Sequence, residues 1–173
     1  MTNMQKGLLL AGVQIGMVLS LGGKLLVDRA RYPRVWAETV AYDPNAPIRG
    51  RYLSVRLKVQ ADSVYPLPLD EESKKNPWME RHEVKVLAVD GKLVVIPSEE
   101  GTGLFVTRSS FSGGTPVLEE PVAYFIPEHA KDPSILQPGE KLWVEVTVPR
   151  KGPPRPIRLG VKKNGVLTPI QLD

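Results

Sequence analysis

An uninterrupted apolar run at the start of the chain limits its architecture more than any other feature. Residues 7–23, GLLLAGVQIGMVLSLGG, lie between Lys6 and Lys24 and carry no charge, and no later run reaches that length. A membrane-spanning helix needs about 20 predominantly apolar residues. Lys24 can extend its amino group to the membrane surface while the apolar residues 25–27 complete the span. We therefore expect residues 1–34 to form one transmembrane helix with a basic flank.

Two other interpretations of this run remain open. A cleaved signal peptide has an apolar core of about 7–15 residues followed by a small-x-small cleavage site. This run is longer, and no A-x-A pattern follows it. The second alternative is a helix buried in a soluble core, but the five glycines of residues 7–23 would weaken a helix in water. We favour a retained anchor, which makes the bilayer the first expected partner.

Small residues recur on one face of the expected helix. Gly12, Gly16 and Ser20 are spaced four apart, and the first two form a GxxxG match. Small side chains let two membrane helices approach closely, and Gln14 can hydrogen-bond across such a contact. This pattern predicts packing against a second copy of the chain or against a multi-spanning membrane protein. Glycine is also simply common in membrane helices, which is the plainer explanation.

A cluster of basic residues follows the run: Lys24, Arg29, Arg31 and Arg34. Basic side chains at a membrane surface attract anionic lipid headgroups, each by about 1 kcal/mol. They are also a topology signal, because basic residues are enriched on the cytoplasmic side of a membrane. The N-terminal side carries only Lys6 and the terminal amine. The charge distribution therefore argues against placing the C-terminal part outside the cytoplasm.

Alternation of apolar and polar residues dominates the rest of the chain, residues 35–173. In residues 52–59, every second residue is apolar: Leu53, Val55, Leu57 and Val59. Residues 141–148 and 157–161 repeat the pattern. Period-two alternation indicates strands that have one face on a core and one face in water.

Turn signals divide this region into short strands. Asp90-Gly91 and Asn164-Gly165 each separate two apolar stretches and predict type I′ hairpin turns. The prediction is an all-β domain over residues 35–173, either an antiparallel sandwich or an open barrel. Residues 62–78 and 109–116 are expected to be surface loops. Strands are expected at residues 35–42, 52–59, 83–89, 93–96, 104–107, 122–126, 141–148, 157–162 and 166–172.

The composition excludes several kinds of site. The chain has no cysteine, so it cannot form disulfides, thiolate metal sites or cysteine nucleophiles. Its net charge of +4 is spread along the sequence without an aromatic-and-basic RNA motif, so we expect no nucleic-acid partner. The two histidines, His82 and His129, lack metal-ligand spacing and resemble exposed loop positions. We therefore expect no metal and no cofactor.

No local pattern indicates catalysis. Ser54 and Lys58 suggest a serine–lysine hydrolase, but four residues along a strand separate them by about 13 Å, whereas nucleophile and base need about 3 Å. Neighbouring carboxylates at 99–100 and at 119–120 would point to opposite faces of a strand. We therefore expect a non-enzymatic protein. A membrane-tethered hydrolase built from residues distant in the sequence is the remote alternative.

The best candidates for ligand binding lie where the strand at residue 52 begins: Arg49, Arg51, Tyr52 and Arg56. Arginines beside an aromatic ring can hold a carboxylate or a phosphate. Tyr52, Arg56 and Lys58 share the polar face of the expected strand. The plainer explanation is that these charges keep the outer face of a half-exposed strand soluble.

Two short motifs occur at this strand and at a later one. Residues 42–57 read YDPNAPIRGRYLSVRL, with a DP turn and then RG-x-Y at the start of the strand, and residues 123–128 read AYFIPE. In this order the chain resembles the GDYXXLXY family of bacterial membrane-anchored proteins. The family's Asp is replaced by Arg51, its Leu by Val55 and its final Tyr by Leu57. A role that depends on that carboxylate is therefore not carried over.

The resemblance implies a topology, with a single-pass protein in the cytoplasmic membrane and the β domain on the extracytoplasmic side. It also implies association with multi-spanning membrane proteins, and the family has no established activity to transfer. The expected function is a non-enzymatic accessory or interaction protein of a bacterial membrane assembly. The alternative is a binding module for an anionic envelope ligand, a lipid headgroup or a glycan, at the arginines near Tyr52.

Overall fold

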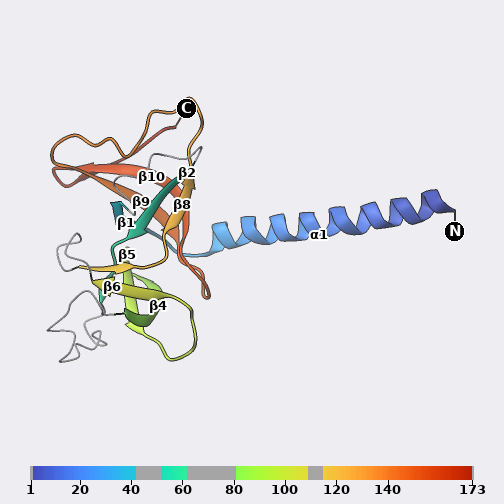
Figure 1. Cartoon of the computed structure of the whole chain (residues 1–173), viewed down its shortest axis with the longest axis horizontal. Helices are drawn as coiled ribbons and strands as arrows, with labels where there is room; N and C mark the ends of the chain where they lie inside the picture. Colours follow the sequence, from blue (N-terminus) through green and yellow to red (C-terminus); the bar gives the residue numbers. More distant parts are fainter. Residues whose placement is uncertain (1, 42–51, 62–80, 109–114, 173) are drawn as a thin grey trace. The chain divides into compact units, whose positions relative to one another are not determined.

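The computed structural model describes residues 2–41, 52–61, 81–108 and 115–172. The chain divides into two compact units, Met1–Tyr32 and Pro33–Asp173. The first unit contains a single helix, α1 (Asn3–Arg31), and the second contains the strands (Figure 1). This confirms the expected fold class, an all-β domain preceded by one N-terminal helix.

Helix α1 begins with a capping box and ends before a proline. The Thr2 hydroxyl accepts a hydrogen bond from the Gln5 N–H at 3.4 Å, and the Gln5 side-chain oxygen accepts one from the Thr2 N–H at 2.9 Å. Both donors would otherwise lack a partner within the helix. At the other end, the Tyr32 N–H donates to the Asp28 carbonyl at 3.0 Å. Tyr32 is extended because Pro33 disfavours helical backbone in the residue before it.

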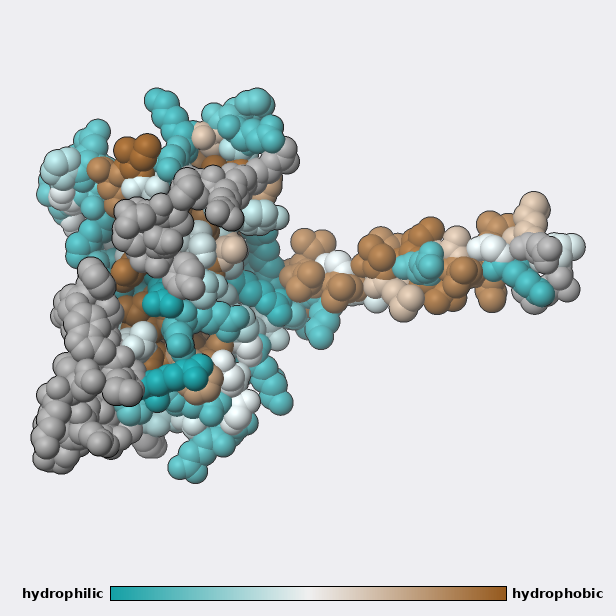
Figure 2. Space-filling model, viewed as in Figure 1, coloured by the Kyte–Doolittle hydropathy of each residue, from teal (hydrophilic) through white to brown (hydrophobic). Residues whose placement is uncertain are grey.

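The helix is long and apolar enough to cross a membrane. Its 29 residues extend about 44 Å, compared with roughly 30 Å for the hydrocarbon core of a bilayer. The segment that meets the length and composition criteria is Met4–Arg31, and no part of it is buried. Apolar side chains line most of its visible length (Figure 2). The expected membrane-spanning segment is therefore a helix that exposes apolar side chains.

Within the described residues, the larger sheet of the β domain has six strands, and all neighbouring pairs are antiparallel. Across its centre, Trp36 pairs with Glu145, and Glu38 pairs with Trp143. In spatial order, the strands are β11 (Val166–Pro169), β10 (Arg155–Lys163), β9 (Glu140–Thr147), β1 (Arg34–Ala41), β2 (Tyr52–Leu57) and β8 (Val122–Phe125).

The smaller sheet has five strands in the part of the chain that the structure describes, and it lies next to the first in the same domain (Figure 1). Its order is β3 (Gln60–Ala61), β5 (Lys92–Pro97), β4 (Arg81–Val89), β6 (Phe105–Arg108) and β7 (Pro116–Leu118). β3 is parallel to β5, and the other pairs are antiparallel. The short strands β3 and β7 are not among those expected from the sequence.

One segment, residues 52–61, takes part in both sheets. Its first part is β2, and its last two residues form β3. Between them, Lys58 forms an antiparallel bridge with Val117, and the Val59 N–H donates to the Pro116 carbonyl at 3.0 Å. The bridge connects this segment to β7. In the smaller sheet, β7 is one edge strand and β3 is the other. The two sheets are therefore joined through continuous backbone, and the smaller one curls toward closure.

The core lies between the sheets and consists mainly of valine and leucine. The apolar face expected for β2 is buried, with Leu57 fully inaccessible, and so is that of β9. Glu145 and Thr147 are also buried, although the alternation assigns them to the outer face of β9. The other buried residues of the core come from both sheets: Val35, Ala37, Val84, Val86, Leu93, Val95, Leu104, Val106, Leu118, Val122, Ile126 and Leu159.

Both expected hairpin turns are present. Asp90 and Gly91 have φ angles of 48° and 71°, and Asn164 and Gly165 have φ angles of 51° and 84°. Two consecutive positive φ angles define the type I′ turn, whose twist matches that of the flanking strands. The first turn joins β4 to β5, and the second joins β10 to β11.

Candidate functional site

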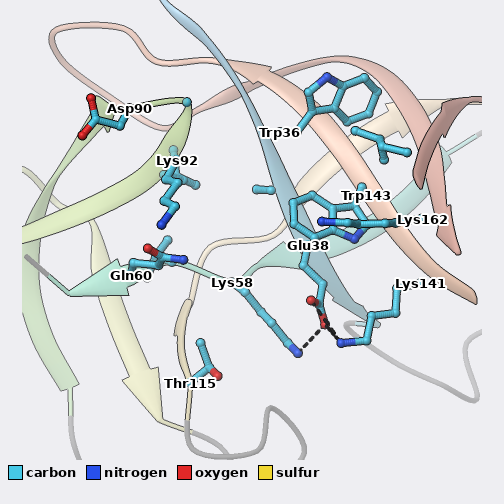
Figure 3. Close-up of a pocket in the computed structure, with 15 residues that line it drawn as sticks. Trp36, Glu38, Lys58, Gln60, Asp90, Lys92, Thr115, Lys141, Trp143 and Lys162 are labelled. Atoms are coloured by element: carbon cyan, nitrogen blue, oxygen red, sulfur yellow. Dashed lines mark hydrogen bonds and ion pairs between the residues drawn. The ribbon is translucent and has the colours of Figure 1, made fainter. Parts of the chain in front are cut away.

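A cleft of about 690 Å³ opens beside β1, between the larger sheet and the turn of the β4–β5 hairpin (Figure 3). This volume lies within the range of about 300–1,000 Å³ that is usual for small-molecule sites. One side is formed by outer-face residues of β1, β9, β10 and β11. The other side is formed by the hairpin turn and by residues 58–60, where the chain passes from one sheet to the other.

The charged side chains around the cleft are mostly basic. Among the described residues that line it there are four lysines and two carboxylates, which leaves two net positive charges: Lys58, Lys92, Lys141, Lys162, Glu38 and Asp90. Three of the lysines occupy polar-face positions at the ends of β2, β9 and β10, and Lys92 follows the type I′ turn. The alternation of side chains along β2, β9 and β10 therefore places Lys58, Lys141 and Lys162 on the outer face of the larger sheet.

Glu38 is the centre of the charged cluster. The amino group of Lys58 lies 2.6 Å from its carboxylate, and that of Lys141 lies 3.1 Å away (Figure 3). Burial alone would raise the pKa of Glu38, but the hydrogen bonds and charges of the two lysines outweigh it and hold the pKa below its usual value. Glu38 is therefore ionised near neutral pH and holds both ammonium groups at the cleft.

Trp36 reaches across the sheet to Gly160. A Cβ atom added at Gly160 would lie 2.9 Å from Cζ3 and 3.0 Å from Cη2 of the Trp36 ring. β1 and β10 are separated by β9, so this contact covers two strand spacings, about 10 Å. The indole therefore extends over β9, and the missing side chain at Gly160 provides the space for its far edge.

A cation lies over each tryptophan of the cleft. The Arg158 guanidinium is 5.4 Å from the centre of the Trp36 ring, and the Lys162 amino group is 4.5 Å from that of Trp143. Glu145, only 7% exposed, accepts a hydrogen bond from Arg158 at 2.6 Å and so holds the guanidinium in place. Such cation–π contacts are attractive, by about 0.5–1 kcal/mol at exposed sites.

Two of the four cleft lysines are not paired with Glu38. Within the described part of the chain, Lys92 and Lys162 form no ion pair, whereas Lys58 and Lys141 share Glu38. The indole N–H of Trp143 is shielded from solvent and has no hydrogen-bond acceptor among these residues. The cleft therefore combines uncompensated positive charge with aromatic surface. That combination is suited to binding an anion that also has an apolar part.

Only two of the four residues of the expected binding site belong to the part of the chain that the structure describes. Arg49 and Arg51 lie outside the described residues. Tyr52 is 60% exposed and forms an edge-to-face pair with Phe125 of β8, with ring centres 5.7 Å apart. Arg56 lies on the same outer face of β2, half-buried, and neither of these two residues lines the cleft. Lys58, two positions after Arg56, does line it and is the point at which the expected site approaches the observed one.

Sequence reasoning missed the two tryptophans of the cleft, and it also missed the charged residues Glu38, Lys92, Lys141 and Lys162. Trp143 falls on the polar face of its alternating strand, between Lys141 and Glu145. A large aromatic residue at such a position, beside a lysine on the same face, was the available signal. Trp36 and Lys92 line the same cleft as Trp143 because of the order of the strands. A local sequence pattern does not reveal that order.

The expected helix residues occupy exposed positions. Gly12 and Gly16 have open space where a Cβ would be, and the Ser20 hydroxyl donates to the Met17 carbonyl at 2.8 Å. Within the basic flank, three residues belong to α1 and one, Arg34, is the first residue of β1: Lys24, Arg29, Arg31 and Arg34.

The expected exposure of the histidines is correct for one of them. His129 is exposed, but His82 lies in β4 and is half-buried, with its Nε2 atom shielded from solvent. The strand begins two residues earlier than expected and thus includes it. No group of three potential metal-binding side chains occurs within residues 2–41, 52–61, 81–108 and 115–172.

In comparisons with known proteins, no family model matches the chain, and no curated protein or solved structure matches it.

Proposed function

We propose that the chain is a membrane-anchored, non-enzymatic binding protein whose β domain holds an anionic ligand in the cleft beside β1. The observation that carries this proposal is the pairing of two uncompensated lysines with two tryptophans at one cleft. A concave surface with charge of one sign concentrates the field and raises the local concentration of counter-ions. The site differs from the arginine site expected from sequence, but the class of ligand is the same.

The N-terminal helix indicates where in the cell this binding would occur. A helix of membrane-spanning length precedes the domain, so the cleft is expected to work within reach of a bilayer. We place the β domain outside the cytoplasm, in a bacterial cytoplasmic membrane, on the strength of the resemblance to the GDYXXLXY family. The basic residues on the C-terminal side of the helix favour the opposite orientation. Protease added to intact spheroplasts decides between them, because only an extracytoplasmic domain is digested before lysis.

A second function, as an accessory subunit of a membrane assembly, is supported by the helix. Gly12 and Gly16 lie on one exposed face with no side chain that would keep a second helix away. We expect Gly12→Leu together with Gly16→Leu to abolish cross-linking through the helix, whereas Val18→Ala with Leu21→Ala, on the opposite face of the helix, leaves it unchanged. Wild-type chain that remains a lone monomer in the membrane, with no cross-linked copy or multi-spanning protein, would refute this second function.

Binding to the cleft is tested with the full chain in phosphatidylcholine nanodiscs. The probes are inorganic phosphate, oligogalacturonate and heparin, with dextran as the neutral control. At least one anionic probe should bind, and more weakly as salt is added, because exposed charges are screened. The double variant Lys92→Ala/Lys162→Ala should bind that probe at least tenfold more weakly.

The control is Lys131→Ala/Lys151→Ala, which removes the same charge at exposed positions that do not line the cleft. It should bind like the wild type. The proposal is wrong if no anionic probe binds, or if both double variants lose affinity equally, since the effect would then follow net charge and not the cleft.

A further inference from the structure

We infer that the ligand of the cleft is an acidic saccharide, bound through a carboxylate on its sugar ring. This inference rests on the proposed function and adds the ligand class. It follows from the uncharged residues of the cleft, which are aromatic, apolar or hydrogen-bonding and which a small inorganic anion would not contact.

The first argument is the aromatic surface. Trp36 extends over β9 to Gly160, and a half-exposed Trp143 lies diagonally from it across the β1–β9 pair. Leu167 of β11 adds an apolar side chain on the same side. A ligand that places its anionic group at Lys162 therefore has indole surface beside it. Burying apolar ligand surface there is favourable by about 25 cal/mol per Å², and the C–H face of a pyranose ring supplies such surface.

The second argument is the position of the charges relative to the rings. Lys162 is held 4.5 Å from the centre of the Trp143 ring, so its ammonium group and the indole contact the same ligand unit. Lys92 approaches from the hairpin on the other side of the cleft (Figure 3). The ligand that fits is one in which charge and ring are directly connected, as in a uronic acid. A phosphatidylglycerol headgroup, with a phosphate on flexible chains, has no rigid face to stack.

The third argument is the set of neutral hydrogen-bonding groups. Gln60 and Thr115 line the cleft with an amide and a hydroxyl. Gln60 is exposed, so its amide is accessible to a ligand. Sugar hydroxyl groups both donate and accept, so they can pair with the oxygen and with the N–H groups of that amide.

The experiment compares four probes with the full chain in nanodiscs. Oligogalacturonate carries ring carboxylates, and its methyl ester keeps the rings without the charge. Inorganic phosphate carries charge without a ring, and phosphatidylglycerol in the nanodisc tests a lipid headgroup. Oligogalacturonate should bind at least tenfold more tightly than each of the other three. Trp36→Leu should weaken it about tenfold, whereas Trp36→Phe, which keeps an aromatic face, should weaken it less.

Saturation-transfer NMR on the wild-type chain provides a readout that needs no variant. If the ring stacks on indole, the ring C–H protons of oligogalacturonate receive the strongest saturation. Equal affinity for phosphate or phosphatidylglycerol, or no saturation of ring protons, overturns the saccharide inference but leaves the proposed function standing. Failure of every anionic probe, heparin included, overturns both.

Discussion

Trp36 lies against Gly160 although a whole strand separates β1 from β10. The contact is close enough that any side chain at Gly160 would displace the indole, since an added Cβ would come within 3.0 Å of two ring carbons. It would also lie 3.1 Å from the Thr168 carbonyl of β11, which as backbone cannot move aside easily. One glycine thus determines how the principal aromatic surface of the cleft lies.

We expect Gly160→Val to lower the free energy of unfolding of the β domain by about 1–3 kcal/mol, the usual effect of overpacking a tight contact. Thermal unfolding followed by circular dichroism measures it. The control Ala123→Val adds the two γ-methyl groups of valine at an exposed position of β8 and should change stability by no more than about 0.5 kcal/mol. Similar stability of the two variants would contradict the described contact.

Substitution of Glu38 should affect both binding and the response to acid. Glu38→Gln removes the negative charge that Lys58 and Lys141 share, so the cleft gains one net positive charge. We expect the affinity for oligogalacturonate to rise severalfold, with a steeper salt dependence. Glu99→Gln removes an equal charge from an exposed position outside the cleft and serves as the control. Unchanged affinity in Glu38→Gln would mean that the charges of Glu38, Lys58 and Lys141 do not affect ligand binding.

The acid response follows from the lowered pKa of Glu38. A carboxylate whose folded-state pKa is below its unfolded value, 4.5, adds stability above that pH. This stability is lost as the pH falls through the folded-state pKa, because the unfolded chain then binds the proton more readily. Unfolding measured between pH 7 and pH 3 should show a smaller loss in Glu38→Gln than in the wild type. An equal acid response in both would contradict the ionic contacts of Glu38.

Glu83 should hold the connection between β5 and β6. Its carboxylate accepts hydrogen bonds from the Gly103 N–H at 2.9 Å and from the Thr102 hydroxyl at 3.1 Å. The Gly103 bond is the main reason that the pKa of Glu83 is lowered. Glu83→Ala should accelerate hydrogen exchange of the Gly103 amide, whereas Glu83→Gln, which keeps an acceptor oxygen, should change it less. Equal exchange rates of the Gly103 amide in the wild type and in both variants would mean that the Glu83 carboxylate does not accept this hydrogen bond.

The β10–β11 hairpin should depend on its glycine. Gly165 has a φ of 84°, a conformation that L-residues adopt at a cost of about 1–2 kcal/mol. Gly165→Ala should therefore destabilise the domain by about 1 kcal/mol in urea unfolding. Asn164→Gly, at the neighbouring position with a φ of 51°, should be tolerated, because glycine adopts this conformation without strain. Comparable destabilisation by both changes would contradict the type I′ turn.

Local pattern was sufficient for much of the fold. The alternation at Leu53, Val55 and Leu57 identified a buried face because side chains of a strand alternate between its two sides. The Asp-Gly and Asn-Gly dipeptides identified both hairpins because they adopt positive φ angles easily. The two-residue strand β3 and the three-residue β7 were missed, since strands this short have no periodicity to detect.

The amino-acid sequence alone determines that this chain has one apolar helix long enough to span a bilayer, followed by a β domain with two type I′ hairpins. These features depend on hydrophobicity, periodicity and turn chemistry within short segments. The cleft depends on tertiary structure: Trp36, Trp143 and Lys92 come from β1, β9 and β5, and the order of strands in two sheets brings them together. Strand order follows from burying the common core, to which residues far apart in the chain contribute at once, so no local segment contains it.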